Sequence, residues 1–542
     1  MFTARGTART LMAAAALLAI FVAGCSGDRR EARRGGTLVV GEISPYESLN
    51  PMRTSDAHAR DIYSLVFLSL LDENDDFMTF EPRLAESWRF SPDRLELTFT
   101  LRNDVLWSDG TPCTARDVEA TFRAQIDTML AWSGRHLKQH ITDVRALDDR
   151  TVVYRFTHAY PYQLMDANDG PILPRQWLEG KSAEQIRGAS IEEMPYNGPF
   201  HIGQWVRGQS LTLLPNDRYY ERGKPYLERV VFKIVPDQVN LLTQLRGGEI
   251  DCMEAPPPME VEPLRNGDYG LEVFNFPARA YGYIGWNNVR KPFDSPAVRR
   301  ALTMAINRRL ILDNLYYGLA EECTSPFISQ FWAYDTSIRP LPYDPAEAKR
   351  ILAAEGFADT DGDGWLDRGG ERFEFELMTN QGNQIRNDIQ VMVQEQLREI
   401  GVKVDPLILE WTVMLEKYKA CDFDAVVNAW RVGTKVDLAP IWSCEARREG
   451  GYNRIGYCNP TVDSLNAAAT AMLDFGEARP LFFRAQELIY EDQPYTFLYY
   501  TPGLLVLHSR FKGARPDAIS MYHNLHEWYV GDAAAKGARD GS

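Results

Sequence analysis

The sequence lacks the short motifs that mark the commonest hydrolases, nucleotide-binding proteins and dehydrogenases. Its 542 residues contain no GxSxG, HExxH, Walker A or dinucleotide-binding fingerprint. They contain no CxxC and no local cluster of Cys and His, which argues against a zinc site. An exported hydrolase of peptides or glycans stays open as a rival class, but 75 acidic residues make chance carboxylate pairs uninformative. We therefore expect a protein that is not an enzyme.

Basic residues are also in deficit. The chain has 59 Lys and Arg against 75 Asp and Glu, for a net charge of −16. Nucleic acids and anionic lipids bind through net basic surfaces, so we expect neither as the main partner. The acidic balance favours a cationic or zwitterionic ligand, and it also serves solubility.

Long apolar runs are absent apart from one near the N-terminus. The run Leu11–Ala23 follows two arginines and is too short to span a bilayer comfortably, which is typical of a signal peptide. It ends in Val-Ala-Gly-Cys25, which looks like a bacterial lipobox; an ordinary signal peptide with an incidental Cys is the alternative. We expect residues 1–24 to be removed, Cys25 to carry acyl chains and residues 25–35 to form a tether outside the cytoplasmic membrane, in the periplasm or on the outer face of that membrane.

Six cysteines remain besides Cys25, and export would allow them to form disulfides. Many pairings of six cysteines exist, and the sequence alone does not choose among them. Cys444 and Cys458 bracket a short Gly-rich loop and make the best local pair. The pairing of the others stays open: Cys113, Cys252, Cys323 and Cys421.

The length of the chain indicates roughly three lobes or domains. The first 180 residues mix strands and helices without a strict β-α-β rhythm, with one helix expected over 61–71. Farther on, a strand at 373–378, a helix at 389–400 and a strand at 402–404 predict an α/β lobe with a parallel sheet. Two long β-like runs, 281–286 and 495–507, are expected to cross between two lobes at a hinge. The Pro-rich acidic stretch 254–263 is expected to be a surface loop.

A candidate ligand site follows the apolar strand that ends at Trp430. In open α/β sheets, ligands bind beyond the carboxyl ends of the strands. Trp430 there offers an aromatic face, and the loop that follows adds Arg431 and Asp437, which carry charges of both signs. The alternative is that Trp430 belongs to the core. The loop after the strand at 373–378 is a second candidate edge of the site and supplies Asn380, Asn383 and Arg386.

A candidate calcium loop lies in Asp-Thr-Asp-Gly-Asp-Gly-Trp-Leu-Asp, residues 359–367. Carboxylates at the first, third, fifth and ninth positions and a backbone carbonyl at the seventh fit an EF-hand-like loop: Asp359, Asp361, Asp363, Asp367 and Trp365. The bidentate Glu at the twelfth position is missing, because Gly370 stands there and Glu371 follows one position late. Structural Ca²⁺ and an ordinary acidic turn are the two interpretations, and we expect no other cofactor.

Several segments, in order, resemble extracytoplasmic solute-binding proteins of the peptide/nickel-binding family, the dipeptide- and oligopeptide-binding lipoproteins that serve ABC importers. The resemblance runs from about Gly36 to about Phe511. The segments that carry it are Pro82–Trp88, Val105–Pro112, Asn197–Phe200, Asn216–Tyr220, Gly248–Asp251, Pro292–Phe293, Val298–Ala301 and Asn453–Tyr457.

The resemblance implies an α/β fold, a two-lobed type II periplasmic-binding-protein clamshell with an extra α+β domain. Lobe one would comprise residues 36–60, 181–275 and 493–542, the additional domain 61–180, and lobe two 276–492. The ligand would bind between the lobes, and the protein would deliver it to a membrane permease. The protein itself would be a monomer. A receptor that feeds a sensor kinase is the other arrangement open at this point.

The resemblance also implies residue roles. Trp430 stands where family members place an aromatic against a bound peptide, and a disulfide between Cys444 and Cys458 is similar to one in dipeptide-binding members. Many peptide binders carry an Asp about three residues after this Trp, but Gly433 stands there, so either Asp437 takes the ligand's ammonium group or the ligand is not a peptide with a free amino terminus. Peptide is the first choice; oligosaccharides, metal chelates and opines are the alternatives. Further ligand contacts are expected at the hinges from Tyr283 and Tyr500, and on lobe one from Leu49 and Asn50.

Overall fold

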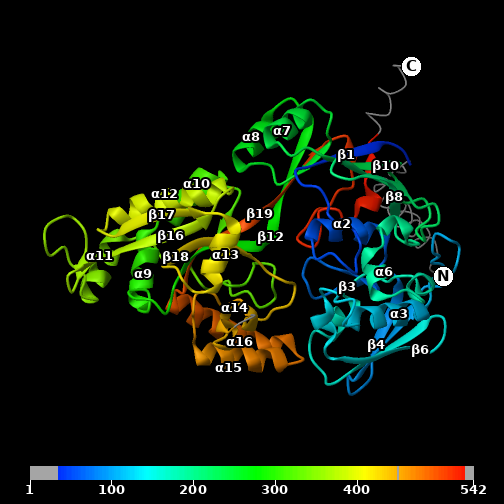
Figure 1. The fold of residues 1–542 in the computed structure, drawn as a ribbon, viewed down its shortest axis with the longest axis horizontal. Coiled ribbons are helices and arrows are strands. Elements are labelled where there is room, and N and C mark those ends of the chain that lie inside the picture. The colour runs from blue at the N-terminus through cyan, green and yellow to red at the C-terminus, as the bar shows by residue number, and fades with distance from the viewer. Residues whose placement is uncertain (1–33, 449–450, 532–542) are drawn as a thin grey trace, which may run out of the picture.

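A computed structural model describes residues 34–448 and 451–531. The predicted signal peptide, Cys25 and most of the tether lie outside these residues. Figure 1 shows two bodies, one built largely from the first half of the chain and one from the second, joined by long central strands. Within the described residues, no helix combines the length and the apolar character needed to cross a membrane.

The two bodies share one 11-stranded mixed sheet in the order β17-β16-β18-β12-β19-β11-β1-β10-β9-β8, with β13 paired to β19. Its long members β12 and β19 pair antiparallel from Leu271↔His508 to Gly285↔Tyr495, with an irregularity after Pro277, and they connect the two bodies. These two strands contain the runs predicted at the hinge. The strands are β1 (Thr37–Glu42), β8 (Phe200–Val206), β9 (Ser210–Pro215), β10 (Arg229–Ile234), β11 (Cys252–Glu254), β12 (Leu271–Trp286), β13 (Glu321–Glu322), β16 (Glu374–Asn380), β17 (Lys403–Leu409), β18 (Ala425–Arg431) and β19 (Tyr495–His508).

Helices of the first body begin and end at recognisable signals. The expected helix over 61–71 is displaced: α2 spans Ala57–Val66, because Asp56 accepts a hydrogen bond from the His58 amide and caps it. The expected loop over 254–263 is wrong, since α8 spans Pro258–Asn266 and its first Pro occupies a position where no amide is needed. The remaining helices of this body are α3 (Ala115–Ile126), α4 (Gln163–Asn168), α5 (Arg175–Leu178), α6 (Ala183–Gly188) and α7 (Gln238–Arg246).

A separate four-stranded antiparallel sheet, in the order β4-β5-β7-β6, lies at the lower right of Figure 1 beside α3. Alternating residues of β5 are buried, as its period-two pattern predicts. Thr114 and Asp117 form a capping box at the start of α3, in which the Asp117 carboxylate accepts a hydrogen bond from the Thr114 amide at 2.7 Å. The strands are β4 (Ala85–Phe90), β5 (Glu96–Leu101), β6 (Ile141–Ala146) and β7 (Thr151–Phe156); the pairs β2 (Leu71–Glu73) with β3 (Phe80–Pro82) and β20 (Phe511–Lys512) with β21 (Tyr529–Val530) stand apart.

The second body contains the predicted parallel unit. Strand β16 pairs parallel with β17 across helix α12 (Gln384–Arg398), and β16 pairs parallel with β18 on its other side. The carboxyl ends of these three strands therefore lie at one edge of the sheet. The other elements are α9 (Pro296–Ala305), α10 (Arg308–Tyr316), α11 (Pro345–Ala354), α13 (Trp411–Lys419), α14 (Ala439–Trp442), α15 (Pro460–Ala471), α16 (Phe475–Asp492) and the hairpin β14 (Asp367–Arg368) with β15 (Glu371–Arg372).

The two bodies have separate apolar cores. One cluster joins buried residues of 38–252 with others of 505–528, so the four-stranded sheet shares its core with the β1 side of the large sheet. Two further clusters are built almost entirely from residues 281–500. Phe77 is the exception: it leaves the first body and packs against Phe331 in the core of the second.

Candidate ligand-binding cleft

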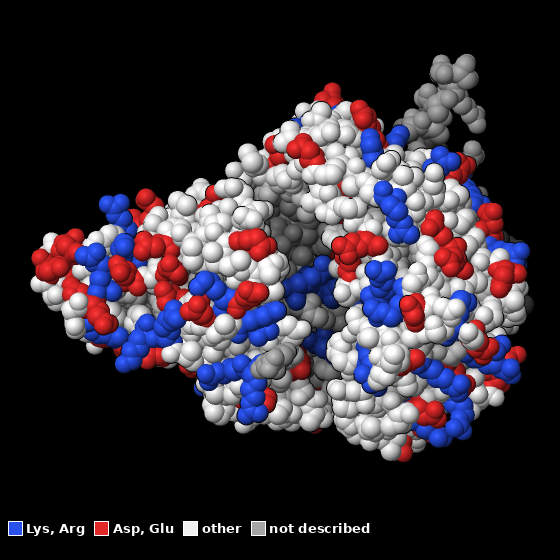
Figure 2. Space-filling model, in the orientation of Figure 1, with Lys and Arg blue, Asp and Glu red and all other residues white. Residues whose placement is uncertain are grey.

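A cavity of about 1590 Å³ lies between the two bodies and is lined by residues of both. Figure 2 shows it as a deep hollow at the middle of the molecule with basic side chains in its depth. Its volume exceeds the roughly 300–1,000 Å³ of ordinary small-molecule pockets. The charged side chains that line it include Arg60, Asp61, Glu73, Arg279, Arg431 and Asp437.

Trp430 is the last aromatic residue of β18 and forms part of the cavity wall. Its indole Nε1 donates a hydrogen bond to the Tyr495 hydroxyl at 3.0 Å. Tyr452 meets the ring edge-to-face, with centroids 6.0 Å apart. These contacts fix the half-buried indole in one orientation, so that its surface is preorganised for a ligand.

Charges of both signs meet in the depth of the cavity. Burial raises the pKa of the Glu73 carboxyl to about 7, although Arg279 and a hydrogen bond from Thr434 act in the opposite direction. Burial also raises the pKa of Asp61 to about 7, with repulsion from Glu254 adding to it. Burial and the neighbouring Arg431 lower the pKa of Arg279 to about 10. The cavity can therefore bind a ligand that carries both an anionic and a cationic group.

The loop after β18 also contacts the opposite body. The Tyr162 hydroxyl donates to the Val436 carbonyl at 2.8 Å and accepts from the Val436 amide at 3.1 Å. Lys435 forms an ion pair with the buried Asp166. Oδ1 of the exposed Asp437 accepts hydrogen bonds from the Ala439 amide and the Asn466 side chain, both at 2.9 Å. Within the described residues, Asp437 Oδ2 has no hydrogen bond.

Four predicted contact residues lie in cores, not at the cavity. Tyr283 is fully buried, and its hydroxyl lies 3.0 Å from that of Tyr418. The Tyr500 hydroxyl donates to the Phe327 carbonyl at 3.0 Å. Leu49 is 1% exposed, and the buried Asn50 donates to the Ile186 and Ala189 carbonyls. The polar groups of Tyr283, Tyr500 and Asn50 therefore make hydrogen bonds within the protein, and the Leu49 side chain is buried.

The second predicted loop contributes no lining residue to the cavity. Asn383 caps α12 by accepting from the Arg386 amide at 3.1 Å. The Arg386 guanidinium donates to the Asn380 side-chain oxygen at 2.7 Å. Strand β16 lies one position farther from the hinge strands than β18, so its loop does not reach the first body.

Two other predicted sites have defined geometry. Cys444 and Cys458 form a disulfide.

In the calcium-like loop, carboxylate oxygens of Asp359, Asp361 and Asp363 lie within 4.8 Å of one another. Both oxygens of Asp359 accept backbone amides, and Asp363 pairs with Arg372. Asp367 accepts from the Thr360 amide and hydroxyl, and the Trp365 amide donates to Asp363. Calcium loading stays a prediction.

The sequence interpretation missed most of the charged floor of the cavity. Arg60 and Asp61 lie on α2, Glu73 ends β2, and Arg279 lies in the irregular part of β12. Pro277 inside an otherwise β-forming run is the sequence signal that could have drawn attention to Arg279, because proline interrupts strand pairing. No local pattern distinguishes Glu73 from the other carboxylates of the chain.

The chain matches a known protein family over more than half of its length. A model described as bacterial extracellular solute-binding proteins, family 5 Middle, matches residues 79–449. The chain belongs to this family, it has the α/β type II periplasmic-binding-protein fold, and it is a solute-binding protein, not an enzyme.

Individual relatives are similar to the chain over nearly its whole length. The chain is 30% identical to the oligopeptide-binding protein AppA of Bacillus subtilis, over 97% of this chain and 99% of that one. The structure of AppA with a nonapeptide matches with a TM-score of 0.76 over 93% of this chain and 100% of that one. DppA from Helicobacter pylori with the peptide STSA is 25% identical, with a TM-score of 0.73 and coverage of 92% and 98%. NikZ from Campylobacter jejuni with Ni(L-His) is 23% identical, with a TM-score of 0.75 and coverage of 91% and 99%, and shows the fold alone.

Proposed function

We propose that this protein is the peptide receptor of an ABC importer. It is exported, held at the membrane by acyl chains on Cys25 and monomeric, and it delivers peptides from the cleft to a permease. The observation that carries the peptide assignment is the cavity of about 1590 Å³ with charges of both signs. A metal ion or a single amino acid would leave most of that volume unfilled, whereas an extended oligopeptide can occupy it. The 30% identity to an oligopeptide-binding protein over nearly the whole chain supports the same assignment.

The lining residues have distinct roles in this proposal. Trp430 packs its fixed indole against the peptide backbone. Asp437 Oδ2 accepts the peptide's ammonium group, and Arg431, which forms no ion pair among the described residues, takes a carboxylate. Pairing each charged end of a zwitterionic peptide offsets the cost of removing both ends from water.

The transport cycle is a population shift between an open and a closed form. A ligand that contacts both bodies binds the closed form more tightly, so it shifts the population towards closure. Strands β12 and β19 connect the bodies and are the elements that would bend. The permease would then recognise the closed, loaded form.

The test is a calorimetric titration of the mature chain, purified without its anchor and stripped of ligand by unfolding and refolding. Synthetic peptides from dipeptides to nonapeptides are titrated, each with its N-acetylated, C-amidated counterpart. We expect saturable one-to-one binding without turnover, weakened when the termini are blocked. Cleavage of the peptide, or binding only of a saccharide, an opine or a metal chelate, would overturn the assignment.

A further inference from the structure

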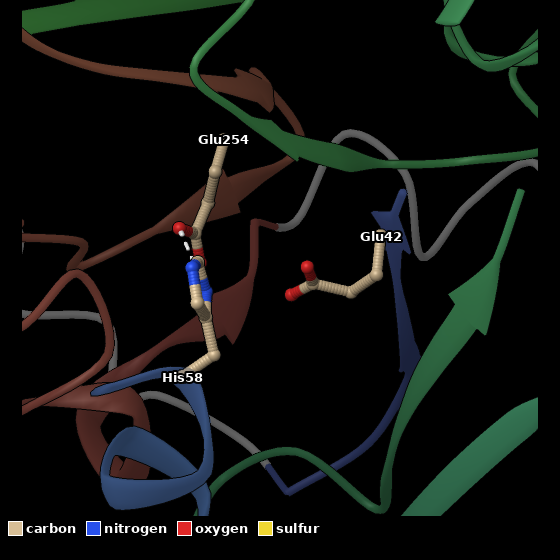
Figure 3. Close-up of side chains that lie close together, drawn as sticks. All are labelled: Glu42, His58 and Glu254. Atoms are coloured by element: carbon tan, nitrogen blue, oxygen red, sulfur yellow. Dashed lines mark ion pairs between the residues drawn. The ribbon is translucent and has the colours of Figure 1, made fainter. Parts of the chain in front are cut away.

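Three side chains from separate elements meet beside the cavity. Glu42 ends β1, Glu254 ends β11 and His58 lies in the first turn of α2. One ligand atom of each lies within 4.8 Å of the others, and the His58 Nδ1 to Glu254 Oε2 distance is 3.9 Å. Figure 3 shows the Glu42 carboxylate directed towards the His58–Glu254 pair. Because these residues are far apart in sequence, their spacing gives no motif.

Glu42 has no adequate partner within the described residues. It is 8% exposed, and its side chain accepts only a long hydrogen bond of 3.4 Å from the Tyr46 hydroxyl. No Lys or Arg of the described chain forms an ion pair with Glu42 or Glu254. Two charged carboxylates that face each other in a buried site are unfavourable, and burial together with Glu254 raises the pKa of Glu42 to about 8. Either a proton on Glu42 or a cation between the two carboxyl groups relieves this repulsion.

A second buried polar group adjoins the cluster. The Tyr522 ring is 1% exposed, and its hydroxyl lies within reach of a hydrogen bond to Glu254. Glu254 and Glu42 are close enough to Tyr522 to act on its ionisation. Tyr522 therefore adds a further oxygen donor beside the two carboxyl groups and supplies no cation to them.

We propose that Glu42, His58 and Glu254 bind a divalent first-row transition-metal ion such as Zn²⁺. Imidazole nitrogen together with carboxylate oxygen is a donor set that such ions accept, with bonds of about 2.0–2.2 Å. Ligand atoms on a tetrahedral ion are then about 3.4 Å apart, close to the 3.9 Å between His58 and Glu254. The ion would neutralise the facing carboxylates and bring them together.

The proposed metal site is accessible from solvent and lies close to the cavity. The His58 side chain is 57% exposed, so an ion can enter from solvent. Asp61 lies one turn farther along α2 and lines the cavity. An ion held by His58 and by the ends of β1 and β11 would anchor the start of α2 to the sheet. The inference goes beyond peptide binding and does not depend on it.

The experiment measures Zn²⁺ binding by equilibrium dialysis and calorimetry on the tag-free mature chain without any peptide. Metal is first removed with a chelator, and Ca²⁺ is titrated separately. We expect one Zn²⁺ to be bound at micromolar or lower concentration. Loss of one ligand, in His58→Ala or Glu42→Gln, should weaken that binding at least about tenfold.

Matched variants make the result decisive. His136 is also exposed but belongs to no such cluster, so His136→Ala should bind Zn²⁺ like the parent chain. Glu42→Gln keeps the size of the side chain and removes a buried carboxyl group, so the variant should fold, which circular dichroism checks. Unchanged Zn²⁺ affinity in both cluster variants, or no binding by the parent chain, would overturn the metal site. Peptide binding plays no part in the readout, so the two proposals fail separately.

Discussion

Tyr162 and Val436 are 274 residues apart in sequence, yet the Tyr162 hydroxyl makes hydrogen bonds to both the carbonyl and the amide of Val436. Tyr162 packs against the core of the first body, and Val436 is part of a core of the second. The contact therefore joins the two bodies at the loop that follows Trp430. Lys435 and Asp166 reinforce it with an ion pair. In the proposed transport cycle, this contact would be lost when the two bodies move apart.

Removing this contact should favour the open form. Tyr162→Phe deletes the hydroxyl and leaves the Val436 amide and carbonyl without that partner, at a cost of about 1 kcal/mol for each hydrogen bond. We expect peptide affinity to fall about tenfold, mainly through faster dissociation. Stopped-flow fluorescence measures the rate. Tyr226→Phe, away from the cavity, is the control; an equal effect of both variants would show that Tyr162 has no special role.

The indole of Trp430 should supply a large part of the binding energy. Trp430→Ala removes the aromatic wall and its hydrogen bond to Tyr495, and we expect peptide affinity to fall at least about tenfold. Thermal unfolding should change little in comparison, because the side chain is only half-buried. Trp411 on α13 is 48% exposed and does not line the cavity, so Trp411→Ala is the matched control. Unchanged affinity in Trp430→Ala would remove this residue from the site.

Asp437 should discriminate ligands by charge. In Asp437→Asn the Oδ1 contacts can be kept, but the negative charge near the cavity is lost. We expect about tenfold weaker binding of peptides with a free amino terminus and little change for their acetylated forms. Calorimetry of the paired peptides measures the difference. If both forms lose affinity equally, Asp437 has no charge-specific role.

Peptide binding should depend on pH through Glu73. Burial raises the pKa of this cavity carboxyl to about 7, so it is protonated below that pH and charged above it. We expect affinity for lysine-containing peptides to rise between about pH 6 and pH 8. The same shift means that the native state keeps a proton that the unfolded chain releases near pH 4.5, so the contribution of Glu73 to stability falls between about pH 4.5 and pH 7.

Glu73→Gln is the variant that isolates this effect. It should flatten the dependence of lysine-peptide affinity on pH and remove the Glu73 part of the stability change, measured by calorimetry and by urea unfolding at each pH. A neutral peptide should show little pH dependence in either protein. An equally steep dependence in the variant would assign the titration to another group.

Local sequence patterns predicted the parallel unit and the long central strands, because the periodicity of a strand is visible in the sequence. They also predicted the cavity wall formed by Trp430, because ligands in such sheets bind beyond the carboxyl ends of the strands. They did not decide which of two neighbouring loops faces the other body. The loops after β16 and β18 end at the same edge of the sheet, but β18 pairs directly with the connecting strand β12. Asn380, Asn383 and Arg386 instead make hydrogen bonds with one another.

The remaining site residues depend on long-range packing. Glu73 and Arg279 meet across about two hundred residues of sequence, and neither lies in a recognisable motif. The polar groups of Tyr283, Tyr500 and Asn50 were plausible ligand contacts, yet each finds a partner inside the protein. Whether a tyrosine near a hinge faces solvent or core is decided by the twist and neighbours of its strand, which its sequence does not specify.

The small molecules that the protein binds in its own compartment would show directly whether the cleft carries peptides. The mature chain, lacking Cys25 and so its anchor, is produced in an oxidising compartment, purified under native conditions and then denatured. Mass spectrometry identifies the released small molecules, with Trp430→Ala protein as the control for adventitious carry-over. We expect a mixture of short peptides that is depleted in the variant. A single non-peptide solute, equally depleted, would contradict it.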